Sequence, residues 1–196
     1  MAAHRAQGLP ALSFAERLAA TARRVAARTA LVDDGGAVLT YAELDARAGV
    51  FAERLARAGA APGNRVAVCL PNGVPFVVAV LGALRAGVTV ATLDPLLRPE
   101  ERAAIESDLE PALTLDDPRA VLAAGAPLPA RRRGARASAD GPLAPPPLIL
   151  YTSGSTGRPK GAVLSDAAVT FANESWAGPV MALREDDVVL AALPLA

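Results

Sequence analysis

The chain has 196 residues, of which 52% are hydrophobic and 20% are charged, and its 20 basic and 20 acidic residues give a formal net charge of zero. This length can bury one sizeable core, and the zero charge argues against a dedicated nucleic-acid or polybasic membrane binder. Cys69 and His4 are the only residues of their kinds, which excludes an internal disulfide framework, a cysteine-cluster zinc site and a multi-histidine metal site.

The amino-terminal segment has no unbroken apolar run of the kind found in secretory signals. The longest apolar run, residues 77–84, is far shorter than the roughly 20 residues of a membrane span. We therefore expect no membrane span and a cytoplasmic protein. Lys160 is the only lysine among the twenty basic residues, so the one position at which lysine replaces arginine attracts attention.

The first third of the chain predicts two capped helices around a hairpin. Ser13 and Glu16 form a capping box that predicts a helix over residues 14–28, and a glycine-rich turn at 34–36 predicts a hairpin over 31–39. A second capping box at Thr40 and Glu43 predicts a helix with an apolar stripe from residue 44 to residue 58, ending at Gly59.

Alternating strands and helices follow. Strands are predicted at residues 65–70, 88–93 and 112–115, and helices at 74–86 and 99–107. This alternation predicts the α/β class, with a mostly parallel sheet flanked by helices. Residues 126–147 are rich in proline and hold four arginines, Arg131, Arg132, Arg133 and Arg136. We interpret this segment as a solvated loop in preference to a phosphate or acidic-partner site, because no aromatic residues interleave.

A loop rich in glycine and hydroxyl residues follows the apolar run at residues 148–151. It reads Thr152-Ser153-Gly154-Ser155-Thr156-Gly157-Arg158-Pro159-Lys160-Gly161 and returns to apolar character at residues 162–164. Gly154, Gly157 and Gly161 permit close backbone approach and positive φ, the hydroxyls add donors, and Lys160 adds a compact cation. The pattern predicts a polyphosphate-binding loop between two strands, with no residue suited to proton transfer or nucleophilic attack.

Two other interpretations of this loop are weaker. A flexible surface loop would not gather four hydroxyl residues, three glycines and the only lysine between two apolar runs. A Walker A loop needs Gly-Lys-Ser/Thr opening into a helix, whereas Pro159 precedes Lys160, Gly161 follows it, and the next residues are strand-like.

Residues 151–161, Tyr-Thr-Ser-Gly-Ser-Thr-Gly-Arg-Pro-Lys-Gly, resemble without a gap the phosphate-loop signature of the adenylate-forming (AMP-binding) superfamily. Weaker resemblances cover Thr40-Tyr41-Ala42-Glu43-Leu44, Pro62-Gly63-Asn64-Arg65-Val66-Ala67, Leu84-Arg85-Ala86-Gly87 with Asp94-Pro95, and the strand-like segment 186–195. Asn64 stands where aspartate is usual. For Tyr41, Glu43, Leu84 and Asp94 we favour purely structural roles, as caps, core and turn.

The resemblance implies a two-step reaction. A carboxylate attacks the α-phosphorus of Mg-ATP, giving an acyl-adenylate and pyrophosphate, and a thiol, often that of coenzyme A, then takes the acyl group. The resemblance assigns Thr152, Ser153, Gly154, Ser155, Thr156, Gly157 and Lys160 to the ATP phosphates, and no catalytic or metal-ligating residue to this chain. The segments 69–73, 91–95 and 98–101 look more like acyl- or aryl-CoA ligases than like peptide-synthetase adenylation domains.

Members of the superfamily are more than twice as long. The resemblance therefore implies that residues 1–196 are a partial amino-terminal AMP-binding domain, without the adenine and ribose segments and the carboxy-terminal domain that bears the catalytic lysine. Three hypotheses stay open: the amino-terminal part of an acyl- or aryl-CoA ligase, truncated or completed by a separate chain; a non-catalytic nucleotide-binding or interaction module; and a gene remnant or gene-model fragment. We expect an exposed apolar sheet edge near residues 188–195 and no adenylation by these residues alone.

Overall fold

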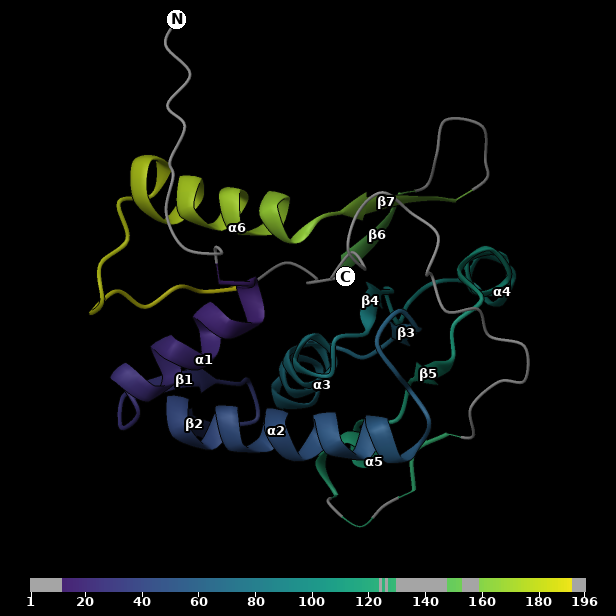
Figure 1. Ribbon diagram of the computed structural model, residues 1–196, viewed down its shortest axis with the longest axis horizontal. Helices are drawn as coiled ribbons and strands as arrows, with labels where there is room; N and C mark the ends of the chain where they lie inside the picture. Colours follow the sequence, from purple (N-terminus) through teal and green to yellow (C-terminus); the bar gives the residue numbers. More distant parts are fainter. Residues whose placement is uncertain (1–11, 124, 126, 130–147, 153–158, 192–196) are drawn as a thin grey trace, which may run out of the picture.

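The computed structural model describes residues 12–123, 125, 127–129, 148–152 and 159–191 (Figure 1). Its centre is a five-stranded sheet of order β5-β3-β4-β6-β7. The strands are β3 (Arg65–Val68), β4 (Thr89–Thr92), β5 (Leu113–Leu115), β6 (Leu148–Thr152) and β7 (Lys160–Leu164). All neighbouring pairs are parallel except β6 with β7, which is antiparallel. The predicted α/β class with a mostly parallel sheet is confirmed.

Helices cover both faces of this sheet. One face carries α2 (Tyr41–Arg57), α3 (Val74–Arg85) and the short α5 (Pro118–Leu122), and the other carries α4 (Pro99–Leu109). Strand alternation divides the core accordingly: Val66 and Val68 join the α2–α3 cluster, whereas Ala67 and Cys69 join the α4 cluster. Because both faces are covered, β3 and β4 are buried along almost their whole length, including Thr89 and Thr92 of β4.

Local sequence signals account for where α2 and α3 begin and end. Both halves of the Thr40–Glu43 capping box form at the start of α2. Behind its end, Gly59 has a φ of 85° and Ala60 donates to the carbonyl of Leu55 at 2.9 Å, which is a Schellman motif. Gly87 ends α3 in the same way, with a φ of 71°.

Helices α2 and α3 pack closely at one glycine. A Cβ added to Gly82 of α3 would lie 2.9 Å from the carbonyl oxygen of Ala48 and 2.9 Å from a ring carbon of Phe51, both on α2. Gly82 is buried, so this close approach leaves no room for a side chain. Gly49, on α2, has ordinary spacing instead, because its added Cβ would lie 3.5 Å from the Arg85 guanidinium.

The first helix is shorter than predicted. Helix α1 (Phe14–Arg24) stops four residues before the expected end at residue 28. The carbonyls of Ala26 and Arg28 turn instead toward the first turn of α2, where they accept hydrogen bonds from the backbone N–H groups of Ala42 and Tyr41. These donors would otherwise lack partners, because the first N–H groups of a helix have none within it. The predicted hairpin follows as β1 (Thr29–Val32) and β2 (Val38–Thr40).

Several elements differ from the sequence predictions. Three of the described elements are not among those predicted. Helix α5 is capped by Asp117, and helix α6 (Asp166–Ser175), capped by Ser165, continues into a π-helical segment η1 (Trp176–Val180). The prediction of a strand from residue 188 is wrong for residues 188–191, the part of this segment that the structure describes. No described strand pairs with residues 188–190, so their backbone groups form no ladder of hydrogen bonds. Their apolar side chains are exposed.

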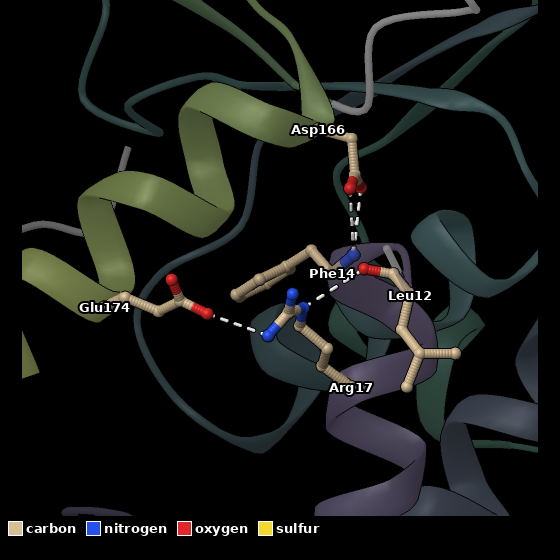
Figure 2. Close-up of polar contacts among 5 residues, drawn as sticks. All are labelled: Leu12, Phe14, Arg17, Asp166 and Glu174. Atoms are coloured by element: carbon tan, nitrogen blue, oxygen red, sulfur yellow. Dashed lines mark hydrogen bonds and ion pairs between the residues drawn. The ribbon is translucent and has the colours of Figure 1, made fainter. Parts of the chain in front are cut away.

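Helix α6 is held by α1. The carboxylate of Asp166 accepts from the backbone N–H of Phe14 at 2.9 and 3.2 Å, and Arg17 pairs with Glu174 at 2.7 Å (Figure 2). The same guanidinium donates to the Leu12 carbonyl. No residue of α6 is buried, so these polar contacts carry much of its attachment.

Candidate phosphate-binding site

The predicted phosphate loop spans the two antiparallel strands at the sheet edge. Thr152 ends β6 and Lys160 begins β7, and the two residues are direct partners across the ladder. Both are exposed. The predicted ligands Ser153, Gly154, Ser155, Thr156 and Gly157 lie outside the described residues. The structure thus brings the first and last residues of the predicted site together at the end of one hairpin.

The ladder also fixes where the two side chains point. Ile149 and Tyr151 pack with the α4 cluster, whereas Leu148 packs with the α2–α3 cluster. Because strand residues alternate, Thr152 belongs to the α2–α3 face, and its partner Lys160 shares that face. A hydroxyl and an ammonium on one face are both donors to a phosphate oxygen.

Lys160 begins a strand that runs to Leu164. A Walker A lysine would instead stand in the first turn of a helix, so the structure supports the rejection of that motif. The strand was expected from residue 162 onward; it starts two residues earlier, because Lys160 and Gly161 already pair with Thr152 and Tyr151.

Gly161 lies in a close contact with the Tyr151 ring and does not have the predicted positive φ. It is not among the described glycines with positive φ, so that expectation is wrong for this residue. Its added Cβ would lie 3.0 Å from Cγ2 of Ile149, 3.1 Å from Cζ of Tyr151 and 3.3 Å from the Tyr151 hydroxyl oxygen. Glycine avoids crowding here because the Tyr151 side chain crosses the backbone of the partner strand, as aromatic residues do over glycines in edge strands.

Tyr151 makes a contact that sequence reasoning missed. Its hydroxyl donates to Oδ2 of Asp108, in the last turn of α4, at 2.7 Å. Burial, with a further contribution from this hydrogen bond to the carboxylate, raises the pKa of Tyr151 well above its usual value of 10.0. Tyr151 therefore stays protonated and remains a donor. No local pattern links two residues this far apart in the chain, so the sequence carries no signal for the pair.

The end of α4 is itself tied to the sheet. Arg65 of β3 donates from Nη1 to the carbonyl oxygen of Leu109 at 2.7 Å. The last turn of α4 has no basic residue of its own, and the residue that ends the helix, Glu110, has a φ of 47°. Arg65 thus supplies the cation that favours a helix carboxy terminus.

The four family-like residues outside the loop have structural contacts. Tyr41 opens α2, and Glu43 completes its capping box, in which the hydrogen bond from the Thr40 backbone lowers the pKa of Glu43 below 4.5. Leu84 packs against the core, and Asp94 accepts from the backbone N–H of Leu96 at 2.8 Å. Glu43, Leu84 and Asp94 thus make the contacts of a cap, a core residue and a turn residue.

The described residues do not gather three or more His, Cys, Asp or Glu side chains in a group that could hold a metal ion. Within the same described ranges, no helix combines the length and the apolar character needed to cross a bilayer. The chemistry that the described part of the hairpin offers is donation to an anion, from Lys160 and Thr152.

Comparison with known proteins places these features in one family. The sequence profile described as "AMP-binding enzyme" matches residues 18–196. The antimetabolite synthetase AmbB of Pseudomonas aeruginosa is 40% identical over 186 residues, which cover 88% of this chain and 14% of AmbB. The 4-coumarate–CoA ligase 5 of Oryza sativa subsp. japonica is 34% identical over 193 residues, which cover 86% of this chain and 36% of the rice protein.

Solved structures agree with this assignment. The o-succinylbenzoate coenzyme A synthetase MenE of Bacillus subtilis, in complex with ATP and magnesium, superposes with a TM-score of 0.74 and 26% identity, covering 91% of this chain and 50% of that one. A benzoate CoA ligase of Burkholderia xenovorans gives a TM-score of 0.70 and 27% identity, covering 90% of this chain and 39% of the ligase. The chain thus spans half or less of these proteins. With the profile match, the parallel sheet and the hairpin that bears Lys160, it belongs to the adenylate-forming family of AMP-binding enzymes.

Proposed function

We propose that this chain supplies the phosphate-binding part of an ATP-dependent acid–thiol ligase. In this proposal Thr152, Ser153, Gly154, Ser155, Thr156, Gly157 and Lys160 bind the β- and γ-phosphates of Mg-ATP. The carboxylate substrate attacks the α-phosphorus, the bond to pyrophosphate breaks, and the acyl-adenylate then passes its acyl group to a thiol with release of AMP.

The observation that carries the proposal is the Thr152–Lys160 pair at the loop end of the β6–β7 hairpin. An exposed ammonium there can stabilise negative charge on the departing pyrophosphate without moving a proton. The donor set fits a polyphosphate, and MenE was solved with ATP and a magnesium ion. Magnesium, when bound with the nucleotide, supplies further neutralisation of phosphate charge; we assign it no ligand in this chain.

We propose coenzyme A as the acceptor thiol, as the segments 69–73, 91–95 and 98–101 favour. Two solved neighbours, MenE and the benzoate ligase, are coenzyme A ligases. The alternative is a carrier-protein thiol, favoured by sequence relatives such as AmbB and the syringomycin synthase SyrB1 of Pseudomonas syringae pv. syringae, which is 37% identical over 164 residues. A carrier-protein domain encoded downstream of this chain would favour the alternative.

We also propose that residues 1–196 do not catalyse adenylation by themselves. The chain covers half of MenE, and in MenE the matching half lies within one longer polypeptide, so the comparisons give no support to a separate second chain. A non-catalytic phosphate-binding module stays the alternative, and a cytoplasmic location stays a prediction. ATP–pyrophosphate exchange by the purified chain, lost in Lys160→Ala, would contradict the inactivity that we propose.

The experiment that tests the phosphate site is calorimetric titration of the chain with ATP and with inorganic pyrophosphate. We expect Lys160→Ala to weaken both about tenfold or more, the effect of losing one charge-assisted contact. Lys160→Arg should retain part of the affinity. Arg57→Ala, which removes an exposed cation of α2, is the matched control and should bind as the wild type does. Unchanged binding by Lys160→Ala would refute the site.

A further inference from the structure

The hydrogen bond between Tyr151 and Asp108 joins the stem of the predicted phosphate loop to α4. Tyr151 is the residue of β6 that precedes Thr152, and its hydroxyl lies 2.7 Å from Oδ2 of Asp108. Asp108 is exposed, whereas the tyrosine ring is half-buried against the α4 cluster. The carboxylate thus holds the outer end of a ring whose inner part is packed.

The same ring holds the partner strand. Cζ and the hydroxyl oxygen of Tyr151 lie next to the position that a Cβ of Gly161 would occupy. Gly161 is the direct ladder partner of Tyr151, and the next pair along the ladder is Thr152 with Lys160. The ring is therefore confined between the last turn of α4 and the β7 backbone, one residue from both ends of the phosphate loop.

This placement matters because side chains alternate along a strand. A slip of one residue between β6 and β7 would turn Lys160 to the face where Tyr151 lies. β7 is an edge strand whose side chains are mostly exposed, so packing gives little resistance to such a slip. The contact of the tyrosine ring with Gly161 resists it, since a residue with a Cβ at this position would crowd the ring.

The anchor is fixed to the centre of the sheet. Arg65 of β3 holds the carbonyl of Leu109, the residue that follows Asp108, at 2.7 Å. Asp108 therefore has a defined position relative to β3. Its hydrogen bond to Tyr151 fixes the position of that ring relative to β3 as well.

We propose that Asp108 is a positioning residue of the phosphate site: through the Tyr151 hydroxyl it holds the tyrosine ring on Gly161 and so keeps Thr152 and Lys160 aligned for phosphate. The inference rests on the proposed function. It assigns Asp108 no contact with substrate. Its effect is on the affinity for phosphate, beyond any effect on the stability of the fold.

The test compares pyrophosphate affinity in the wild type and its variants by calorimetry, at a temperature at which thermal unfolding shows each variant to be folded. We expect Asp108→Ala and Tyr151→Phe each to weaken binding about three- to tenfold, which is less than the loss of a direct hydrogen bond to a charged group, because neither residue contacts the phosphate. The double variant should bind no more weakly than either single one, because both changes break the same contact. Asp108→Asn keeps a side-chain oxygen acceptor and should restore most of the affinity.

A matched control and a spectroscopic signature separate positioning from stability. Glu106→Ala removes another carboxylate of α4, one that pairs with Arg102 rather than with Tyr151, and should leave pyrophosphate affinity unchanged. In nuclear magnetic resonance spectra, Asp108→Ala should shift the α-proton signals of Gly161, which lie beside the aromatic ring, whereas Glu106→Ala should not.

The outcomes distinguish the two proposals. Wild-type affinity in Asp108→Ala, with affinity lost in Lys160→Ala, would overturn the positioning role and leave the proposed function intact. Equal losses in Asp108→Ala and Glu106→Ala would also overturn it, as a general effect of damaging α4. Absence of pyrophosphate binding by the wild-type chain would contradict the proposed function, and the positioning role with it.

Discussion

The carboxylate of Asp166 lies at the start of two helices at once. It belongs to the first residue of α6 and accepts hydrogen bonds, at 2.9 and 3.2 Å, from the backbone N–H of Phe14, the first residue of α1 (Figure 2). Each helix presents the positive end of its dipole there, which favours a negative charge. One side chain thus stabilises both helix starts and joins segments from opposite ends of the chain.

We expect Asp166→Ala to lower the free energy of unfolding by about 1–2 kcal/mol, because the Phe14 N–H loses its acceptor. Asp166→Asn should cost less, since an amide oxygen can still accept. The matched control is Glu174→Ala, which breaks the exposed ion pair with Arg17 and should change stability by no more than about 0.5 kcal/mol. Urea denaturation followed by circular dichroism measures all three, and equal losses in Asp166→Ala and Glu174→Ala would contradict the prediction.

Two glycines of the α2–α3 pair should respond in opposite directions to alanine. Gly82→Ala places a methyl group 2.9 Å from backbone and ring atoms of α2, and we expect a loss of about 1–3 kcal/mol from overpacking. Gly49→Ala meets only the flexible end of Arg85, and should add about 0.5–1 kcal/mol because alanine favours the helix. Thermal unfolding tests the pair; a stabilised Gly82→Ala variant would show that the two helices separate easily.

The capping boxes predict acid sensitivity. The backbone hydrogen bond from Thr40, followed by the one from its hydroxyl, lowers the pKa of Glu43 below 4.5, and Ser13 does the same for the pKa of Glu16. A carboxyl whose pKa is lowered by folding stabilises the native state above pH 4.5, and that contribution is lost as the pH falls below 4.5 through the lowered value.

Glu43→Gln keeps the capping hydrogen bonds but cannot titrate, so we expect it to reduce the loss of stability between about pH 5 and pH 3. Glu43→Ala should instead lower stability at neutral pH as well, because the box is broken. The measurement is a urea titration at several pH values. A Glu43→Gln variant with the same pH dependence as the wild type would refute the assignment.

The surface of α6 and η1 predicts self-association. Three large apolar residues there and one that directly follows η1 are exposed, namely Phe171 (71%), Trp176 (61%), Val180 (62%) and Met181 (52%). Exposed apolar groups of this kind favour association. We expect concentration-dependent oligomers in sedimentation experiments, and fewer in the double variant Phe171→Ser/Trp176→Ser. Val32→Ser, at an exposed site on β1, is the control, and a monodisperse wild-type monomer would contradict the prediction.

Local signals predicted most of the central fold. The capping boxes at Ser13 and Thr40 and the glycines at 59 and 87 marked helix ends, and apolar runs marked β3 and β4. Asp117 and Ser165 cap α5 and α6, two helices that no apolar periodicity predicts. Residues 188–190 are apolar and were expected as a strand, yet no described strand pairs with them. A strand forms only where a neighbouring strand accepts and donates its backbone hydrogen bonds, and an apolar run does not show whether such a neighbour exists.

The residues of the phosphate loop predict its function, but they do not predict the contacts of Tyr151 with Gly161 and Asp108 beside it. The sequence predicts close backbone approach and positive φ at Gly161; the positive φ is wrong, and the glycine instead leaves room for the Tyr151 ring. Asp108 carried no signal, because the contact with Tyr151 arises only when α4 and β6 are brought together by the sheet. Tertiary contacts between segments distant in sequence are the part that local pattern cannot supply.

The antiparallel pairing of β6 with β7 has a consequence for how this chain folds. Thr152 and Lys160 are near neighbours in sequence, whereas β6 meets β4 only by joining residues as distant as Leu148 and Val90. Closing a short loop has a low entropic cost, and hairpins form on the microsecond scale, well before most long-range pairings. The two ends of the phosphate loop can therefore meet as a nascent hairpin, and the slower docking of this hairpin onto β4 then gives Tyr151 access to Asp108.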